Sequence, residues 1–391
     1  MFKEVINEIP PHRMLSLDVF RGITITMMIM VNNPGSWSHM YAPLRHAEWN
    51  GWTPTDWIFP FFIFIMGISI VLSFEKQLAS GKSKKELVQK SISRALKLFG
   101  LGLVLNALSI NLFQPDFSFW HDSVLQLRIM GVLQRLGVVY LITALLVLYL
   151  SKRWLVITAA ILLVVNWIGM ALIPYPVADG VWVSGLLQHG NNFAAFIDSV
   201  VLGADHVYFN TEPLAYDPEG LWSTLTSVAS CLAGVFTGWY ITPSKNDYKQ
   251  VSTVLFTGVA VLVAGYVASI FIPINKTIWT PSYVLATTGV ALLFLGFCMF
   301  LIDMKKVKTW SAPFVAFGAN AIAFFMMAGV LGRLILMPMV DDMRLKSWIY
   351  SEFFAPAFGS LNGSLIYSIV LVALYFIPMY VMYRKGIFWK V

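Results

Sequence analysis

Charged residues are scarce in this chain of 391 residues, because Asp, Glu, Lys and Arg together make up only 12% of it. Hydrophobic residues make up 58%, and the mean hydropathy is +0.72. Soluble globular domains are roughly a quarter charged and half apolar, so this composition excludes an ordinary soluble protein. It predicts an all-α polytopic membrane protein.

Cysteine is almost absent as well, and both copies, Cys231 and Cys298, lie in apolar stretches. We interpret them as small buried side chains, not as a disulfide or a metal pair. The sequence also lacks a GxxxxGK[ST] phosphate loop, the metal motifs HExxH and CxxC, and a GxSxG nucleophile elbow. No metal site is therefore predicted.

Apolar runs long enough to cross a bilayer, which takes roughly 20 residues, occur about ten times along the chain. The third is amphipathic at its start, where Lys90, Arg94 and Lys97 recur at helical spacing. No repeat and no cleavable signal peptide are expected, and residues 1–391 are predicted to form one transmembrane domain. The expected spans are 15–34, 55–75, 89–111, 129–150, 153–173, 220–242, 251–273, 278–302, 312–336 and 363–383.

The positive charges concentrate in alternate loops, which predicts how the bundle is oriented. Short cytoplasmic loops of membrane proteins carry the excess of Lys and Arg. Both termini are therefore expected in the cytoplasm. Because the net charge of +7 comes from these particular loops, it does not indicate a nucleic-acid partner. The residues that carry the bias are Lys3, Arg13, Lys76, Lys82, Lys84, Lys85, Lys152, Arg153, Lys245, Lys249, Lys305, Lys306, Lys308, Arg384, Lys385 and Lys390.

The longest outer loop, 174–219, contains no Lys or Arg at all. Long loops of this kind are usually lids or binding loops, so we predict a lid that contacts the acceptor substrate. Within it, 191–202 alternates like a short interfacial helix, and Asp217-Pro218-Glu219-Gly220 predicts a turn into the sixth span. Every histidine except His12 falls on this outer side.

One of these histidines, His46, stands in an aromatic outer loop between the first two spans. A neutral imidazole can act as a general base, although a loop histidine can also simply bond to backbone. The neighbouring Trp49, Trp52 and Trp57 are compatible with an interfacial aromatic belt or with the wall of a sugar-sized pocket. Asn32, at the end of the first span, could donate to an oxyanion or only end its helix.

Two arginines lie inside apolar spans, Arg21 in the first and Arg135, after Gln134, in the fourth. An arginine at the bilayer centre costs about 2.5–3.5 kcal/mol on insertion scales, so something must compensate for it. A salt bridge could do so, with Asp18 as a candidate partner of Arg21, and so could the phosphates of a ligand. The sequence leaves both explanations open.

Several segments together resemble a known family. LSLDVFRGITI, VNNPGSW, LRHAEWNGWTPTDWIFPFFIFIMGISI and, further along, RIMGVLQRLGVVYL, AYDPEGLWSTLTS and INKTIWTPSYVL are similar to the membrane-embedded acyltransferases related to the lysosomal heparan-alpha-glucosaminide N-acetyltransferase. The RHAEWNG and AYDPEG blocks are the specific ones. The resemblance implies a bundle of about ten or eleven helices that takes acetyl-CoA from the cytoplasm and acetylates the amino group of a terminal glucosamine on the far side.

The resemblance also implies roles for individual residues. The family's catalytic histidine corresponds to His46 and its asparagine to Asn32. Acetyl-CoA, the expected cosubstrate, would contact basic and amide groups of the spans, and the acceptor would contact the outer loops. The candidate acetyl-CoA-binding residues are Arg21, Lys97, Gln134 and Arg135, and the candidate acceptor-binding residues are Trp49, Asn50, His206, Asp217, Glu219 and Lys276.

The acceptor itself stays open, because the large luminal domain of the lysosomal enzyme has no counterpart expected here. The favoured hypothesis is a multi-pass protein of the bacterial inner membrane that acetylates a periplasmic amino sugar or glycan, with a homodimer as one candidate assembly. An O-acetyltransferase of cell-wall glycan is one alternative. An amino-sugar transporter without chemistry is the other, although the seventh and eighth spans lack the carboxylates that ion coupling would need.

Overall fold

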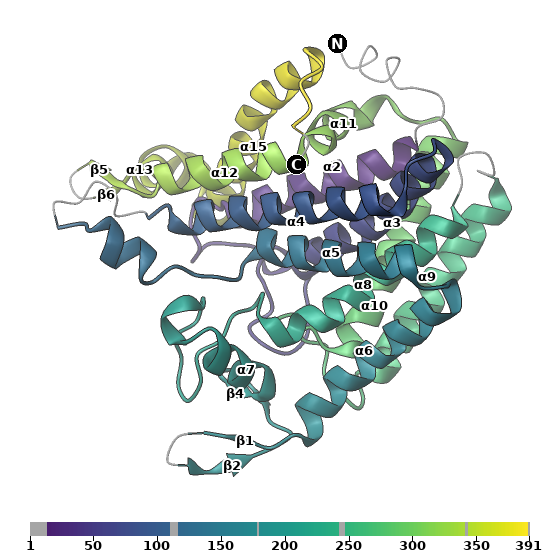
Figure 1. Cartoon of the computed structure of the whole chain (residues 1–391). Helices are drawn as coiled ribbons and strands as arrows, with labels where there is room; N and C mark the ends of the chain where they lie inside the picture. Colours follow the sequence, from purple (N-terminus) through teal and green to yellow (C-terminus); the bar gives the residue numbers. More distant parts are fainter. Residues whose placement is uncertain (1–13, 110–115, 178–179, 242–246, 341–342, 390–391) are drawn as a thin grey trace.

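Long apolar helices make up most of the structure, and its few strands are two or three residues long (Figure 1). The computed structural model describes residues 14–109, 116–177, 180–241, 247–340 and 343–389. Four of the charges used to predict the orientation, Lys3, Arg13, Lys245 and Lys390, lie outside these residues, as does His12.

Eight of the described helical segments are long and apolar enough to cross a membrane, judged by length and composition. The chain is therefore an all-α polytopic membrane protein, as predicted. These segments are α2 (Leu15–Asn32), α3 (Ile58–Ala79, after the 3-10 turn Pro54–Trp57), α5 (Val132–Tyr149), α6 (Lys152–Leu172), α8 (Leu221–Tyr240), α9 (Tyr248–Ala268), α10 (Pro281–Cys298, continued by the π-helix Met299–Met304) and α15 (Ser360–Arg384).

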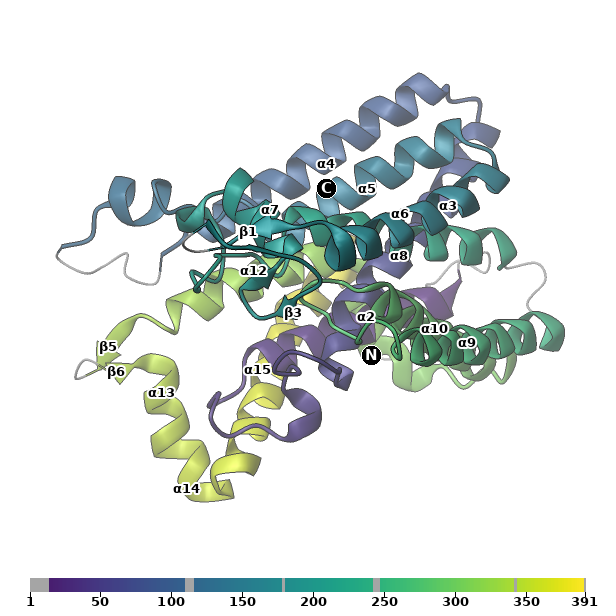
Figure 2. The same cartoon turned by 90° about the horizontal axis from the view of Figure 1, so that it is seen from below.

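The two remaining expected spans differ from simple membrane helices. The run at 312–336 is broken into α11 (Ala312–Ala319) and α12 (Ala321–Leu334), which bend by 73° at Asn320. The Asn320 side chain bonds there to the backbone of Ile387 and Trp389, both at 2.9 Å. The amphipathic third run is α4 (Lys84–Ala107), which does not pass the same test of apolarity among the described residues. It lies alongside α5 (Figures 1 and 2).

Helix starts follow local capping patterns. Ser83 and Glu86 form a capping box at the start of α4, with the Ser83 N–H 2.7 Å from Glu86 Oε2 and the Glu86 N–H 3.2 Å from Ser83 Oγ. Asp247 caps α9 by accepting from the Gln250 N–H at 2.8 Å. Such residues satisfy backbone donors that no helical carbonyl reaches.

Glycines let the central helices approach each other closely. A Cβ at Gly67 of α3 would lie 2.0 Å from the Cys231 carbonyl oxygen of α8, and one at Gly234 would lie 2.0 Å from that of Phe64. Small residues at such crossings are typical of membrane bundles, where close van der Waals packing stabilises helix pairs. Cys231 and Cys298 are both buried and free, which confirms that they are small core side chains.

The segment 174–219, which the sequence predicts to be an outer loop, contains secondary structure of its own. It holds a small hairpin of β1 (Tyr175–Pro176) and β2 (Trp182–Val183), a second of β3 (Leu187–Gln188) and β4 (Asn191–Asn192), and the helix α7 (Phe193–Val201). The expected short helix is thereby confirmed, and Asn192 caps it through the Ala195 N–H at 2.9 Å. The expected turn before α8 is also present, with the Gly220 N–H bonded to the Asp217 carbonyl at 2.9 Å.

The connection between α12 and α15 is a further irregular segment, seen at the left and bottom of Figure 2. It contains β5 (Pro338–Val340), β6 (Met343–Arg344), α13 (Leu345–Ile349), the π-helix Tyr350–Phe354 and α14 (Ala355–Phe358).

The two ends of the described chain lie at the same end of the bundle. Met14 and Leu15, at the start of α2, belong to one buried cluster with Tyr383 of α15 and Ile302 after α10. Residues 1–13, 390 and 391 lie outside the described residues, so the side on which the termini lie stays a prediction.

Candidate active site

His46 and Asp56 form a close polar pair in the connection between α2 and α3. His46 Nδ1 lies 2.6 Å from Asp56 Oδ1, although ten positions separate the residues in the sequence. The other carboxylate oxygen accepts from the backbone N–H groups of Ala47, at 3.1 Å, and Thr53, at 2.9 Å. Asp56 therefore both caps the start of the 3-10 turn Pro54–Trp57 and faces the imidazole.

The two side chains differ strongly in exposure. The Asp56 side chain is 1% exposed, whereas that of His46 is 44% exposed. A carboxylate that accepts from Nδ1–H fixes the imidazole tautomer and leaves Nε2 unprotonated. The pair therefore presents an oriented basic nitrogen that a substrate can reach, which is the arrangement of a general base or nucleophile held by a third group.

Lys276 completes this cluster from the loop between α9 and α10. Its Nζ lies 3.0 Å from His46 Nδ1, 3.4 Å from Nε2 and 3.5 Å from Asp56 Oδ1. The loop is held in place by a bond from Gly51 N–H to the Ile274 carbonyl, at 2.8 Å, and one from Asn275 Nδ2 to Asn50 Oδ1, at 3.3 Å. Burial lowers the pKa of Lys276, and the charge of Asp56 offsets part of that shift.

Asp217 and Glu219 are held by an arginine that the sequence analysis did not single out. Arg128 binds Asp217 with two bonds, Nε to Oδ2 and Nη2 to Oδ1, both 2.7 Å, and Nη2 also contacts Glu219 at 2.5 Å. Burial raises the pKa of Glu219, but the charges of Arg128, Arg135 and Lys276 hold it below its ordinary value. Glu219 thus links the Arg128 group electrostatically to Lys276.

Replacing Arg128 by Met should destabilise the fold strongly. The side chain of Asp217 is fully buried, and breaking a buried ion pair by removing one partner typically costs about 3–5 kcal/mol. The midpoint of thermal unfolding in detergent should fall clearly below that of the wild type. Arg153→Met, at an exposed position, is the control and should unfold like the wild type. An Arg128→Met protein with an unchanged midpoint would contradict the structural role of this network.

Arg135 is completely buried near the same place. Its Nη2 donates to the Gly220 carbonyl at 3.1 Å and to the Ser223 hydroxyl, and its guanidinium lies 5.1 Å from the centre of the Trp279 ring. These contacts satisfy Nη2, whereas Nε and Nη1 have no hydrogen-bond partner among the described residues. Arg21 has its expected partner, with Nη1 3.3 Å from Asp18 Oδ1, and it also donates to Ser69 at 3.0 Å.

A cavity of about 440 Å³ lies between α2, α3, α4, α5 and the α11–α12 break. Its polar groups are Arg21, Ser69 and Arg94, and the rest of the lining is mostly apolar. Arg94 stacks 4.6 Å from the centre of the Tyr140 ring, and among the described residues its Nε has no hydrogen-bond partner. The lining runs along α3 from Phe62 to Ser69, which is about 10 Å of helix. Its volume is within the usual range of ligand sites, about 300–1,000 Å³.

The structure does not bring together all residues predicted to bind acetyl-CoA. Arg21 lines the cavity, whereas Lys97 is exposed on α4 and does not line it. Gln134 and Arg135 are buried but belong to other contacts, Gln134 lying against Gly102. Arg94, three positions before Lys97, is the cation of α4 that faces the cavity.

The predicted acceptor residues are also distributed unevenly. Asn50 and Lys276 lie at the His46 cluster, as described above. Trp49 instead donates to the Leu187 carbonyl at 2.6 Å and packs against His189. It therefore connects the loop that contains His46 to the segment 174–219. His206 is 2.8 Å from the Leu127 carbonyl, next to Arg128. Asn32 ends α2 with an exposed side chain, and no hydrogen bond in the described ranges joins it to His46.

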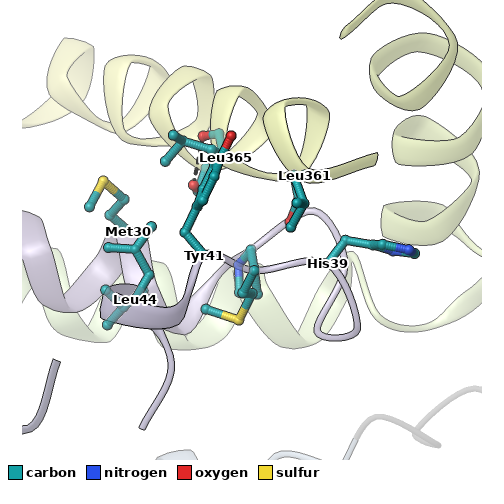
Figure 3. A pocket seen from close by; sticks show the side chains of 11 residues that line it. Met30, His39, Tyr41, Leu44, Leu361 and Leu365 are labelled. Carbon is teal, nitrogen blue, oxygen red and sulfur yellow. Dashed lines mark hydrogen bonds between the residues drawn. The ribbon is translucent and has the colours of Figure 1, made fainter. Parts of the chain in front are cut away.

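A second outer histidine, His39, lies in a different environment. It is at the rim of a cavity of about 10 Å³ between α2 and α15, which is about the size of one water molecule. Figure 3 shows its ring extending away from Met30 and Leu44. His39 lies 3.3 Å from the Ser36 hydroxyl, and the contacts of the described residues give it no carboxylate partner. It is thus a natural comparison for His46.

Sequence reasoning missed Asp56, Arg94 and Arg128. Asp56 could have been found, because Thr53-Pro54-Thr55-Asp56 is a capping-box pattern that places its carboxylate at the start of a helix. Arg128 is a lone basic residue in an outer connection that is otherwise without Lys or Arg, which suggests a specific anionic partner. Arg94 had no distinguishing signal beside Lys90 and Lys97.

The comparisons with known proteins concern the family of this chain. Residues 13–194 match the family described as heparan-alpha-glucosaminide N-acetyltransferase, catalytic. The heparan-alpha-glucosaminide N-acetyltransferase of Homo sapiens is 30% identical over 99% of this chain. The resemblance to the heparan-alpha-glucosaminide N-acetyltransferases is confirmed. The Mus musculus protein of the same name is 29% identical over 97% of this chain.

The family match covers only part of the candidate site. The chain spans 61% of the length of each of these two N-acetyltransferases. The family match includes His46, Asp56 and the cavity residues Arg21 and Arg94, but it ends before Asp217, Glu219 and Lys276. The similarity to the two relatives extends over nearly all of this chain. Among the described residues, no group of three or more His, Cys, Asp or Glu side chains could hold a metal ion.

Proposed function

We propose that this protein is a transmembrane acetyltransferase that moves an acetyl group from cytoplasmic acetyl-CoA to the amino group of a glucosamine-type sugar on the other side. The single observation that supports it most is the 2.6 Å contact between exposed His46 and buried Asp56, in a chain similar to N-acetyltransferases. An oriented imidazole with a reachable Nε2 is what acyl transfer to an amine requires.

The chemistry at His46 balances in either of two ways. In direct transfer, the amine attacks the thioester carbonyl, Nε2 takes the amine proton, the C–S bond breaks, and the imidazolium returns the proton to the CoA thiolate. In two-step transfer, Nε2 itself attacks the carbonyl, the C–S bond breaks, and CoA leaves as a thiolate. The amine then attacks the acetyl-imidazole, the bond between Nε2 and the acetyl group breaks, and the amine proton passes through Nε2 to the CoA thiolate. The Lys276 ammonium lies beside the imidazole, where it can stabilise the oxyanion of either intermediate. Asn32 stays a prediction for that role.

The cavity supports a route for the acyl donor. Phe62 is the first residue of α3 that lines the cavity. It lies six residues after Asp56 on the same helical segment, or about 9 Å along the axis. At the other end, Arg21 and Arg94 provide positive charge for phosphates. We propose that pantetheine occupies this cavity, with the nucleotide at the arginines and the thioester towards His46.

Filling the cavity should test this route. Leu136→Trp would place an indole among the lining residues. Overpacking of this kind typically costs about 1–3 kcal/mol. The KM for acetyl-CoA should therefore rise by about tenfold or more. Acceptor binding should change little. The control is Ile161→Trp on the exposed face of α6, which should behave as the wild type. An unchanged KM in Leu136→Trp would exclude this cavity as the donor site.

The orientation of the protein is also part of the proposal, and cysteine labelling tests it. His206→Cys, in the outer loop, should react with a membrane-impermeant maleimide in intact cells. Ser83→Cys, in the basic loop before α4, should react only after the cells are opened, because the Lys-rich loops are expected in the cytoplasm. Labelling of Ser83→Cys in intact cells would reverse the assignment of sides. We propose that the protein lies in the inner membrane of a bacterium, so the labelling is done in bacterial cells.

The function itself is tested by incubating the purified protein with radiolabelled acetyl-CoA and glucosamine. Release of CoA together with labelled N-acetylglucosamine is the expected result. If N-acetylglucosamine replaces glucosamine as acceptor, no transfer should occur, whereas an enzyme that acetylates hydroxyls would still transfer. Absence of any CoA release with either sugar would overturn the proposal and favour a carrier.

A further inference from the structure

A second large cavity lies apart from the proposed catalytic route, where α3, α5 and α8 end and α4 and α6 begin. Its volume is about 420 Å³, and it shares no lining residue with the cavity beside Arg21 and Arg94. Phe74 and Leu148 form a buried floor, and Val71, Leu78 and Val147 continue the apolar wall.

Two lysines and two aromatic rings stand at the mouth of this cavity. Lys84 Nζ lies 5.7 Å from the centre of the Tyr149 ring, and Lys152 Nζ lies 4.7 Å from that of Trp239. Lys84, Tyr149 and Trp239 line the cavity. Glu75 also lines it with an exposed side chain, so the two lysines exceed the one carboxylate at the mouth. The cavity therefore combines an apolar interior with a cationic, aromatic entrance.

The surroundings of this cavity indicate which ligand can reach it. α6, which begins at its edge, exposes a row of large apolar side chains that includes Trp154, Val156 and Ile161. Such a face belongs against lipid acyl chains. An amphiphile arriving along α6 could place a chain against Phe74 and Val147 and leave its headgroup between the two lysines. Basic pockets between membrane helices are suited to anionic lipid headgroups.

We propose that this cavity, between Lys84 and Lys152, binds one phospholipid whose headgroup carries a net negative charge. The lysines contact the phosphate, Tyr149 and Trp239 lie at the level of the headgroup, and the apolar wall holds part of one acyl chain. The site does not depend on the acetyltransferase proposal, because none of its residues belongs to the His46 cluster or to the donor cavity. Each proposal can fail without the other.

Native mass spectrometry of the purified full-length protein tests the lipid site. Dioleoylphosphatidylglycerol and the zwitterionic dioleoylphosphatidylcholine are titrated separately into protein in a neutral detergent. We expect one saturable site for the anionic lipid, at least tenfold tighter than for the zwitterionic one. In Lys84→Ala/Lys152→Ala, binding of the anionic lipid should weaken by about 25-fold, or about fivefold for each lysine. Both lysines are exposed, so the variant should keep its thermal stability.

Two further variants separate this site from general surface charge. Lys305→Ala removes a lysine that also stacks on an aromatic ring, 5.4 Å from the centre of Phe300, but that lines no part of the cavity. It should leave lipid binding unchanged. Val147→Trp keeps every charge and fills the cavity, and it should abolish the saturable site. Equal binding of both lipids, unchanged binding in the double variant or in Val147→Trp, or displacement of the lipid by coenzyme A would each overturn the proposal.

Discussion

His46→Ala should reduce acetyl transfer from acetyl-CoA to glucosamine by about 10²–10⁴-fold, the usual contribution of a positioned general base. If His46 instead carries the acetyl group, the loss should approach the limit of detection, because the imidazole Nε2 is then the atom that forms the covalent intermediate. Acetyl-CoA binding and thermal stability should change little, since the imidazole is 44% exposed and contributes little packing. Transfer is measured with labelled acetyl-CoA and protein in nanodiscs.

The matched control is His39→Ala. His39 is also an exposed outer histidine in the connection that follows α2, but its polar neighbour is the Ser36 hydroxyl, not a carboxylate. It should keep near-normal activity. Comparable rates in His46→Ala and the wild type would remove His46 from the reaction.

A trapping experiment separates direct from two-step transfer. Wild-type protein is incubated with labelled acetyl-CoA in the absence of acceptor and then analysed by peptide mass spectrometry. A label on His46 supports the acetyl-imidazole, whereas its absence at short quench times supports direct attack by the amine. Either result is compatible with His46→Ala being inactive, so the two experiments answer different questions.

Asp56→Asn should lower kcat by about 10²–10⁴-fold, because an amide that donates to Nδ1 favours the imidazole tautomer with a protonated Nε2. The asparagine Oδ1 can still accept from the backbone N–H groups of Ala47 and Thr53, so the turn should form. The KM for acetyl-CoA should stay near that of the wild type. Kinetic assays with both substrates varied separate the two parameters.

The control for this variant is Asp205→Asn, an exposed acid in the outer loop. It should leave kcat unchanged. If Asp56 were only a helix cap, Asp56→Asn would lower the thermal unfolding midpoint with no selective loss of kcat. That outcome would limit Asp56 to a structural role.

The sequence could predict the helices because their signals are local. Apolar length and the turn at Asp217–Gly220 each act within a few residues, and both are found where they were expected. The break at Asn320 had no such signal, because the bonds that stabilise it reach Ile387 and Trp389, more than sixty residues away. The polar start of α4 indicated an unusual helix, but it did not predict which helix α4 packs against.

Part of the candidate site was also accessible from the sequence. His46 could be selected from its residue type, its outer position and the RHAEWNG block. Its partner could not be selected with the same certainty, because an aspartate at a helix start serves equally well as a cap. Only the folded loop turns one oxygen of Asp56 to the backbone and the other to Nδ1.

The sequence by itself thus determined that this chain is a multi-span membrane protein, and it predicted that the reactive groups lie on the outer side. Hydrophobic length and charge bias are properties of short segments, so they can be read from the sequence without knowledge of the fold. Only the tertiary structure decided which charges meet. Lys276 contacts His46, 230 positions away in the sequence. Arg128 binds Asp217 and Glu219. Arg94, not Lys97, faces the cavity. Those choices depend on how helices distant in sequence pack together, and no local pattern encodes that packing.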